Sequence, residues 1–383
     1  MIDSTWINDL LRALVRIDSV NPTLDPGSGP GEAEIAAFTA GVLRDLGLDV
    51  EILESVPGRP SVVGRMAGDG RGASLMLNAH YDTVGVEGMA DPFSGDIHNG
   101  RLHGRGSYDM KGSLAACIGA VEALVRTGRR PAGSVVLAAV ADEEAASIGT
   151  QDVLKSYVTD GAIVTEPTSL RLCLAHKGFV WYRVVTSGRA AHGSRPDLGI
   201  DANLHMGRVL ARLDGLAWTL ANGRAHPLVG PASIHAATIA GGTGLSTYAA
   251  QCRLGIERRT IPGETESEAT TQIRKILDEL AAADAGFDAS LDIELVRDSF
   301  EARSDSPLAE SLTRAASAVV GRPPDRVGDS PWMDSALTAA AGIDTIVFGP
   351  HGQGAHAAEE WVDLESVHQT AAVLAATILD YCG

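Results

Sequence analysis

Short apolar segments alternate with helical segments over the first 178 residues, and this alternation limits the folds open to the chain. The apolar segments include SVVGRMAG (61–68), ASLMLNAH (73–80) and SVVLAAVA (134–141), and the helical ones include 34–47 and 112–128. Strands and helices that alternate in this way are typical of an α/β domain with a mostly parallel sheet. We therefore predict that fold class for this part of the chain.

The pattern changes between Phe179 and Glu294, where the predicted order is strand, helix, strand, strand, helix, strand. That order is typical of a two-layer, ferredoxin-like α+β unit. After residue 295 the earlier alternation returns. We predict one α/β domain formed by residues 1–178 and 295–383, interrupted by a smaller inserted domain formed by residues 179–294.

The chain is strongly acidic, with 49 Asp and Glu against 31 Lys and Arg among 383 residues, a formal net charge of −18. This charge repels phosphate backbones and anionic lipid surfaces, so we expect neither a nucleic-acid partner nor a membrane partner. No segment has the roughly 18 to 20 consecutive apolar residues of a membrane span. Residues 1–18 are typical of an amphipathic helix and not of a signal peptide, so we expect a cytoplasmic location.

Acidic and histidine side chains follow the predicted strands at the points where these strands end. Ligands in open α/β sheets gather at the carboxyl ends of the strands, so we expect these side chains to lie close together. The residues are His80, Asp82, Asp109, Glu143, Glu144, Glu166 and His356. Two histidines and three carboxylates suffice to bind two divalent metal ions with a water between them.

The identity of the metal follows from which ligand types the chain offers. The four cysteines are scattered, with no C-x-x-C pair, so the sequence suggests neither a disulfide framework nor a thiolate site. Oxygen and imidazole ligands without thiolate suit zinc, with cobalt or manganese as alternatives. The sequence therefore predicts a site for two zinc ions.

Three acids stand side by side at 142–144, directly after the apolar strand Val135–Ala141. Adjacent side chains on an extended segment point in opposite directions. We therefore expect one of Glu143 and Glu144 to bind metal while the other faces the attacking water as a general base.

Five motifs in this order resemble the dizinc amidohydrolase and peptidase family that includes acetylornithine deacetylase, succinyl-diaminopimelate desuccinylase, aminoacylase-1 and glutamate carboxypeptidase. They are HYD (80–82), GRGSYDMKGS (104–113), ADEE (141–144), TEP (165–167) and GAHAAEE (354–360), and the resemblance covers nearly the whole chain.

The resemblance implies a role for each candidate residue. His80 and Glu166 would hold one zinc, Glu144 and His356 would hold the other, and Asp109 would bridge both. Asp82 would accept the second imidazole N–H of His80, and Glu143 would be the general base. The family also has a cis peptide after the bridging aspartate, so we expect one between Asp109 and Met110.

The insertion is similar to the family's lid and dimerisation domain, which implies a homodimer. Within GRAAHGSRPDLGIDAN (188–203), His192 would stabilise the oxyanion of a neighbouring subunit's substrate. Within IERRTIPGE (256–264), Arg259 would bind a substrate carboxylate. Two positions depart from the family pattern. Ser246 stands where relatives have asparagine, and Trp332 stands where relatives have small residues, so it either walls the substrate pocket or packs in the core.

These observations predict a cytoplasmic, dizinc hydrolase that cleaves an amide bond next to a carboxylate, removing the acyl group from an N-acyl amino acid. A dipeptidase or carboxypeptidase that acts on a short peptide at the same centre is the first alternative. The second alternative is a catalytically silent homologue with a binding or regulatory role. The presence of Glu143 and of all five predicted ligands argues against the silent homologue.

Overall fold

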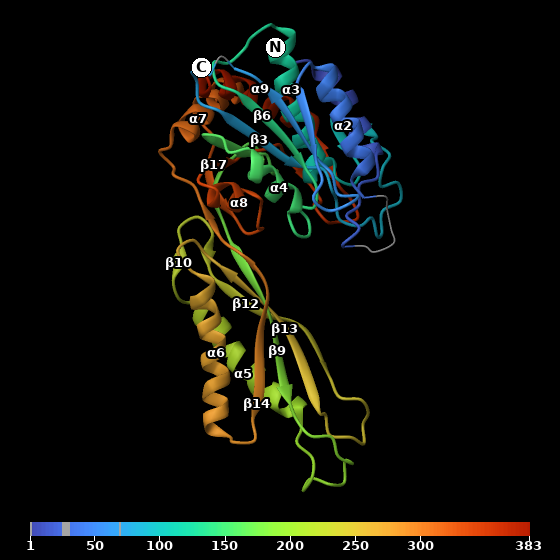
Figure 1. Cartoon of the computed structure of the whole chain (residues 1–383), viewed down its shortest axis with the longest axis vertical. Coiled ribbons are helices and arrows are strands. Elements are labelled where there is room, and N and C mark those ends of the chain that lie inside the picture. The colour runs from blue at the N-terminus through green and yellow to red at the C-terminus, as the bar shows by residue number, and fades with distance from the viewer. Residues whose placement is uncertain (1, 25–30, 69) are drawn as a thin grey trace. The chain divides into compact units, whose positions relative to one another are not determined.

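A computed structural model describes residues 2–24, 31–68 and 70–383, and the chain divides into two compact units (Figure 1). Unit 1 comprises Met1–Leu174, Ala302–Val327 and Met333–Gly383. Unit 2 comprises Ala175–Glu301 and Gly328–Trp332, and it contains the predicted insertion, 179–294.

A mixed sheet forms the centre of unit 1, and its four middle strands, β6, β3, β7 and β17, are parallel. The neighbouring pairs toward both edges are antiparallel. The predicted α/β class with a mainly parallel central sheet is therefore confirmed. In spatial order the strands are β1 (Asp49–Leu53), β2 (Ser61–Met66), β6 (Val135–Val140), β3 (Leu75–His80), β7 (Gly161–Val164), β17 (Asp344–Val347), β8 (Leu172–His176) and β15 (Phe300–Glu301), with β16 (Arg326–Asp329) also paired to β8.

Strand β6 shows why the middle strands are apolar along their whole length. Val135, Leu137 and Ala139 belong to the hydrophobic core on one face of the sheet. Val136 and Ala138 belong to a second core on the other face. Because successive side chains of a strand point to opposite faces, a strand covered on both sides must be apolar throughout.

Helices cover both faces of this sheet. The larger core includes residues of α1, α2, α3, α7 and α9, and α3 and α9 pack against each other (Figure 1). The smaller core includes Val153 of α4. The helices of unit 1 are α1 (Ser4–Arg16), α2 (Ala33–Asp45), α3 (Gly112–Arg126), α4 (Ile148–Ser156), α7 (Pro307–Val320), α8 (Ser335–Ala340) and α9 (Leu364–Tyr381).

A small antiparallel sheet also belongs to unit 1, and it holds the segment that contains His356. Its strands are β18 (Gly352–Gln353), β19 (Trp361–Asp363), β5 (Arg101–His103) and β4 (Ile97–His98) in that order. The loop 354–360 joins β18 to β19. Two segments far apart in sequence, 97–103 and 352–363, are thereby fixed side by side.

Unit 2 has the predicted ferredoxin-like order, β9, α5, β12, β13, α6, β14, and an antiparallel sheet in the order β12-β13-β9-β14. Apolar residues of both helices pack with the sheet in one core. A hairpin of β10 (Ala225–His226) and β11 (Gly230–Pro231) lies between α5 and β12 in sequence. The main elements are β9 (Gly178–Ser187), α5 (Ala202–Ala221), β12 (Ser233–Gly241), β13 (Gln251–Thr260), α6 (Glu266–Ala283) and β14 (Asp288–Arg297).

The N-terminal segment forms the predicted amphipathic helix. The Asp3 carboxylate caps α1 by accepting the N–H of Trp6, and Ile7, Leu11 and Leu14 bury one face of the helix. Across the described ranges 2–24, 31–68 and 70–383, every helix is too short or too polar to cross a membrane.

Candidate metal centre

The carboxyl ends of the parallel strands β3, β7 and β6 supply three of the five predicted ligands. His80 is the last residue of β3, Glu166 follows β7, and Glu144 follows β6. His356 lies in the loop that follows β17 and β18. Parallel neighbours end at the same edge of a sheet, so side chains from segments far apart in the sequence converge there.

The five predicted ligands form two groups that share Asp109. One group contains His80, Asp109 and Glu166, and the other contains Asp109, Glu144 and His356. Asp109 Oδ1 lies 3.2 Å from His80 Nε2, and Asp109 Oδ2 lies 3.5 Å from His356 Nε2. Glu166 Oε1 lies 3.6 Å from His80 Nε2. Glu144 Oε2 lies 3.0 Å from His356 Nε2.

The charge balance of this cluster fits two bound cations. Side chains of three acids crowd around two imidazoles, and most of these side chains are shielded from solvent. Hydrogen bonds with Asp109 and Glu144 raise the pKa of His356 to about 10, so the surroundings strongly favour positive charge there. Buried carboxylates need such compensation, and a pair of divalent ions would supply it.

Glu360 fixes the segment that carries Asp109. Its carboxylate accepts the main-chain N–H groups of Gly106, Tyr108 and Asp109 at 2.9 to 3.1 Å, and it pairs with Arg105 at 2.7 Å. The segment forms a single wide helical turn, η1 (Ser107–Lys111), that leads into α3. The peptide bond between Asp109 and Met110 is cis, as predicted.

The acids after β6 lie on a turn, and our expectation of an extended segment is wrong. Asp142 has a φ of +68°, and its main-chain carbonyl accepts the N–H groups of Ala146 and Ser147. An aspartate tolerates this left-handed conformation better than most residues do. The turn still directs the two glutamates apart. Glu143 Oε2 lies 3.9 Å from His80 Nε2, whereas Glu144 reaches His356.

Asp82 contacts its neighbours differently from the expectation. The hydrogen bond of His80 Nδ1 goes to the main-chain oxygen of Asp82 at 3.0 Å, and the Asp82 carboxylate lies 3.6 Å away. The carboxylate instead accepts the N–H of Glu143 at 3.1 Å and that of Glu144 at 3.2 Å. Asp82 therefore fixes both the imidazole of His80 and the turn with the two glutamates.

The environment of Glu143 suits a proton carrier. Burial raises the pKa of Glu143 well above its usual value, and the nearby charge of Glu166 raises it further. A carboxyl group with a raised pKa takes up a proton more readily and can then deliver it to a leaving group.

Asp334 is a buried acid that the sequence analysis did not include in the site. Its Oδ2 accepts the hydroxyl of Thr150 at 2.5 Å, and Asn78 donates to the same hydroxyl at 2.9 Å. Burial raises the pKa of Asp334 to about 6, and its charge in turn raises the pKa values of Glu143 and Glu166. In the sequence, Asp334 lies between β16 and α8. An acid in that position after a strand was the signal that could have identified it.

His192 and Ser246 lie together in unit 2. The N–H of Gly193 donates to the main-chain oxygen of Ser246 at 2.7 Å, and His192 bridges to Thr247. The imidazole of His192 is exposed, and its Nδ1 lies 2.8 Å from the hydroxyl of Ser194. The hydrogen bond of Ser246 to Gly193 uses the main-chain oxygen of Ser246, so the Ser246 hydroxyl does not join its segment to that of His192.

Arg259 and Trp332 also belong to unit 2. Arg259 pairs with Glu257 at 2.7 Å, and its guanidinium lies 5.0 Å from the centre of the Phe179 ring. Trp332 packs edge-on against Phe179 and donates from its indole nitrogen to the main-chain oxygen of Asp298 at 3.0 Å. Trp332 is half-buried in this aromatic cluster.

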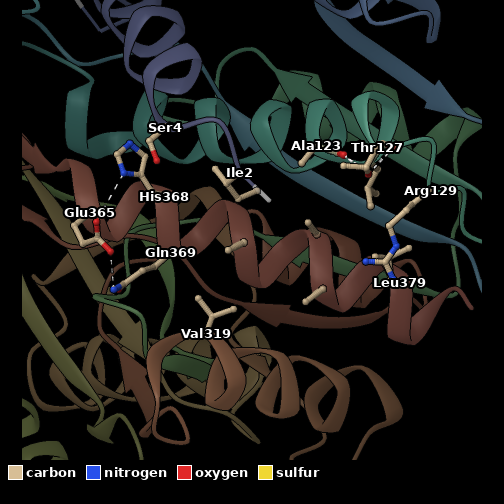
Figure 2. Close-up of a pocket in the computed structure, with 14 residues that line it drawn as sticks. Ile2, Ser4, Ala123, Thr127, Arg129, Val319, Glu365, His368, Gln369 and Leu379 are labelled. Atoms are coloured by element: carbon tan, nitrogen blue, oxygen red, sulfur yellow. Dashed lines mark hydrogen bonds and ion pairs between the residues drawn. The ribbon is translucent and has the colours of Figure 1, made fainter.

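A cavity of about 570 Å³ in unit 1 is separate from the predicted site (Figure 2). Along its rim, Gln369 of α9 donates to Glu365 at 3.1 Å. The residues that line it are Ile2, Ser4, Ala123, Leu124, Thr127, Arg129, Val319, Glu365, His368, Gln369, Ala372, Ala375, Ala376 and Leu379. The predicted ligands and Glu143 are not among these residues.

The fold and the paired ligand groups define a class of protein: metal-dependent hydrolases that act on amide bonds. The sequence profile of peptidase family M20/M25/M40 matches residues 76–380, and the chain belongs to this family.

Relatives by sequence and by structure agree with this assignment. Acetylornithine deacetylase of Vibrio atlanticus is 28% identical over 98% of both chains. That of Myxococcus xanthus is 29% identical over 91% of this chain and 90% of its own. The fold matches aminopeptidase PepT of Bacillus cereus with a TM-score of 0.82, 18% identity and full coverage of both chains. It also matches YXEP of Bacillus subtilis, a dinuclear metal-binding M20 peptidase, with a TM-score of 0.73 and 17% identity over 99% of both chains.

Proposed function

We propose that the protein is a dizinc deacylase that cleaves the amide bond of an N-acyl amino acid. The observation that carries this proposal is the convergence of two ligand groups on one shared carboxylate, Asp109, with Glu143 beside them. The sequence relatives, two acetylornithine deacetylases, favour an N-acyl amino acid over other amides. The ligand types favour zinc, with cobalt or manganese as alternatives.

The chain's own residues have distinct tasks in the proposed reaction. Two zinc ions would polarise the amide carbonyl and lower the pKa of the attacking water. Glu143 takes the proton of that water and delivers it to the leaving amine. His80, Glu166 and Asp109 would hold one ion, and Asp109, Glu144 and His356 would hold the other. Asp82 keeps His80 and the turn at 142–147 in place.

Residues of unit 2 are proposed to contact the substrate. Arg259 binds its carboxylate, because a guanidinium fork matches the two carboxylate oxygens. His192 donates to the oxyanion of a partner subunit's substrate, and the exposure of its imidazole supports a role outside its own chain. We retain Ser246 and Trp332 as candidates for specificity, Trp332 because it extends the aromatic surface that Phe179 begins beside Arg259.

A homodimer through unit 2 is supported by an apolar helix face without a partner in the described chain. Leu204 and Trp218 of α5 are 70% and 71% exposed. Between them lie Gly207, Ala211 and Gly215 on the same exposed face. Such a face suits the close approach of an identical helix running the opposite way, with Trp218 of each copy against Leu204 of the other. Strand β12, at the end of its sheet, offers a second contact.

His192 is expected to act across that dimer. His192→Ala should lower turnover by about 10²- to 10³-fold, since it removes one donor to a charge that develops in the transition state. When inactive His192→Ala is mixed with inactive Glu143→Ala under conditions of subunit exchange, about half the dimers are mixed and each has one complete site, so activity should recover to roughly a quarter of wild type.

The Trp218→Asp variant is the control for this mixing experiment. A charge on the α5 face should keep the chain monomeric in sedimentation, and the two mutants built in that background should show no recovery. If the original pair exchanges subunits, as mass spectrometry of mixed dimers can verify, but activity stays absent, His192 does not act in trans.

A metallopeptidase acting on short peptides is the second candidate function, because the structural matches include an aminopeptidase. A panel of acetylated, succinylated and formylated amino acids, compared with dipeptides on zinc-loaded protein, separates the two. We expect kcat/KM to be highest for an N-acyl amino acid. A higher value for dipeptides would replace the deacylase proposal with a peptidase proposal, and turnover of neither class would favour a non-catalytic homologue.

The expected cytoplasmic location stays a prediction.

A further inference from the structure

A buried ion-pair network lies directly behind the turn that carries Glu143 and Glu144. Arg59 is only 7% exposed, and its guanidinium forks onto both carboxylate oxygens of Glu32 at 2.6 and 2.7 Å. The Nη2 atom, which with Nε contacts Glu32, also donates to Asp142 Oδ1 at 2.6 Å, and Nη1 donates to Thr23 at 3.0 Å. All three nitrogens of the guanidinium therefore donate hydrogen bonds.

Asp142 transmits this contact to the turn. It is fully buried, it has a φ of +68°, and its main-chain oxygen accepts the N–H groups that close the turn at Ala146 and Ser147. Its carboxylate is held by Arg59 on one side and by the N–H of Ile148 on the other. The contacts of Asp142 therefore fix the start of the turn, and with it the positions of Glu143 and Glu144.

Asn21 connects Asp142 to Asp82. Its amide nitrogen donates to Asp142 Oδ1 at 3.0 Å and to Asp82 Oδ2 at 2.8 Å. Asp82 in turn accepts the N–H groups of Glu143 and Glu144. The turn is thus held from both sides, by Asp142 before it and by Asp82 beneath it.

Arg59 is the guanidinium that pairs with both Glu32 and Asp142 in this acidic network. Glu32, Asp82 and Asp142 are all fully buried, and burial raises the pKa of Glu32 to about 6. Lysine could not replace Arg59 without loss, because an ammonium group lacks the planar fork that serves Glu32 and Asp142 together. The geometry of the turn therefore depends on the shape of this side chain as well as on its charge.

We infer that Arg59 is a positioning residue, which acts through Asp142 to hold Glu143 and Glu144 in their working geometry. The inference rests on the roles proposed above for these two glutamates. Residues that orient metal ligands and bases from behind typically change activity or metal affinity by about 10- to 100-fold when altered. We expect an effect of this size at Arg59.

The test compares Arg59→Lys and Glu32→Gln with wild type at saturating zinc. Both variants keep the approximate size of the side chain, so they should fold. We expect kcat to fall about 10- to 100-fold with little change in KM, because the base is displaced while substrate contacts are kept. In Arg59→Ala, added guanidinium at low millimolar concentration should restore part of kcat by filling the vacated site.

The matched control is Leu312→Ala, a variant of a fully buried core residue on α7. It should lower the melting temperature without changing kcat of the folded enzyme, and guanidinium should not affect it. If the Arg59 and Glu32 variants keep wild-type kcat, or if their loss merely follows melting temperature and guanidinium rescues nothing, Arg59 is not a positioning residue.

Glu143→Ala in the same assay separates this inference from the proposed function. A wild-type rate for Glu143→Ala would refute the proposed reaction itself. If Glu143→Ala is inactive while Arg59→Lys keeps the wild-type rate, only the role of Arg59 is refuted.

Discussion

Removal of metal with a chelator should abolish hydrolysis of the N-acyl amino acid, and adding zinc should restore it. The expectation follows from the two candidate ligand groups, which would hold the ions that polarise the amide carbonyl. The chain should stay folded after chelation, because the cores of both units are formed without the ligands. Circular dichroism of the stripped protein checks this, and activity then reports on metal alone.

The metal content of variants should also show whether Asp109 serves both ligand groups. Wild-type protein purified without chelator should hold about two zinc equivalents per chain. Glu166→Ala should hold about one, since it damages one ligand group, whereas Asp109→Ala should hold close to none, since it damages both. Equal losses in the two variants would argue against a bridging role for Asp109. Full activity in verified metal-free protein would end the dizinc proposal.

Most of the fold could be predicted from sequence because apolar periodicity is local. A strand such as β6 must be apolar along its length when both faces are covered, and the run Val135–Ala141 displays that requirement directly. The change to the order of a ferredoxin-like unit after Phe179 is likewise visible in the alternation of segments. The antiparallel edges of the central sheet were less accessible, since strand direction depends on pairing partners distant in sequence.

The five candidate ligands could be selected from the sequence because each follows an apolar strand or lies in a recognisable motif. The residues that hold them could not, because their partners are far away in sequence. Glu360 binds the N–H of Asp109 across 251 positions, and Arg59 binds Asp142 across 83. No local pattern relates such pairs. The left-handed Asp142 was missed for another reason, since three adjacent acids are compatible with both a turn and a strand end.

Substitutions of Glu143 and Glu144, the two glutamates of the turn after β6, should distinguish the general base from the metal ligand. Glu143→Gln should keep both metals but lower kcat by about 10²- to 10⁴-fold, because an amide of the same shape cannot take a proton. The turn itself should persist, since the main-chain N–H of residue 143, not its side chain, is bound by Asp82. Glu144→Gln should lose turnover together with roughly one metal equivalent, because Glu144 belongs to a ligand group and reaches His356.

Metal analysis alongside kinetics distinguishes these outcomes, and the Asp109→Ala protein supplies the reference for loss of both ions. If Glu143→Gln loses metal as Glu144→Gln does, then Glu143 is a ligand and the base must be sought elsewhere. Asp334 would be the next candidate, because it is the remaining buried acid whose charge acts on both Glu143 and Glu166 and whose Oδ1 has no hydrogen-bond partner in the described structure. Asp334→Asn would then show the loss in kcat with metal content unchanged, whereas with Glu143 as the base it should leave most of the turnover intact.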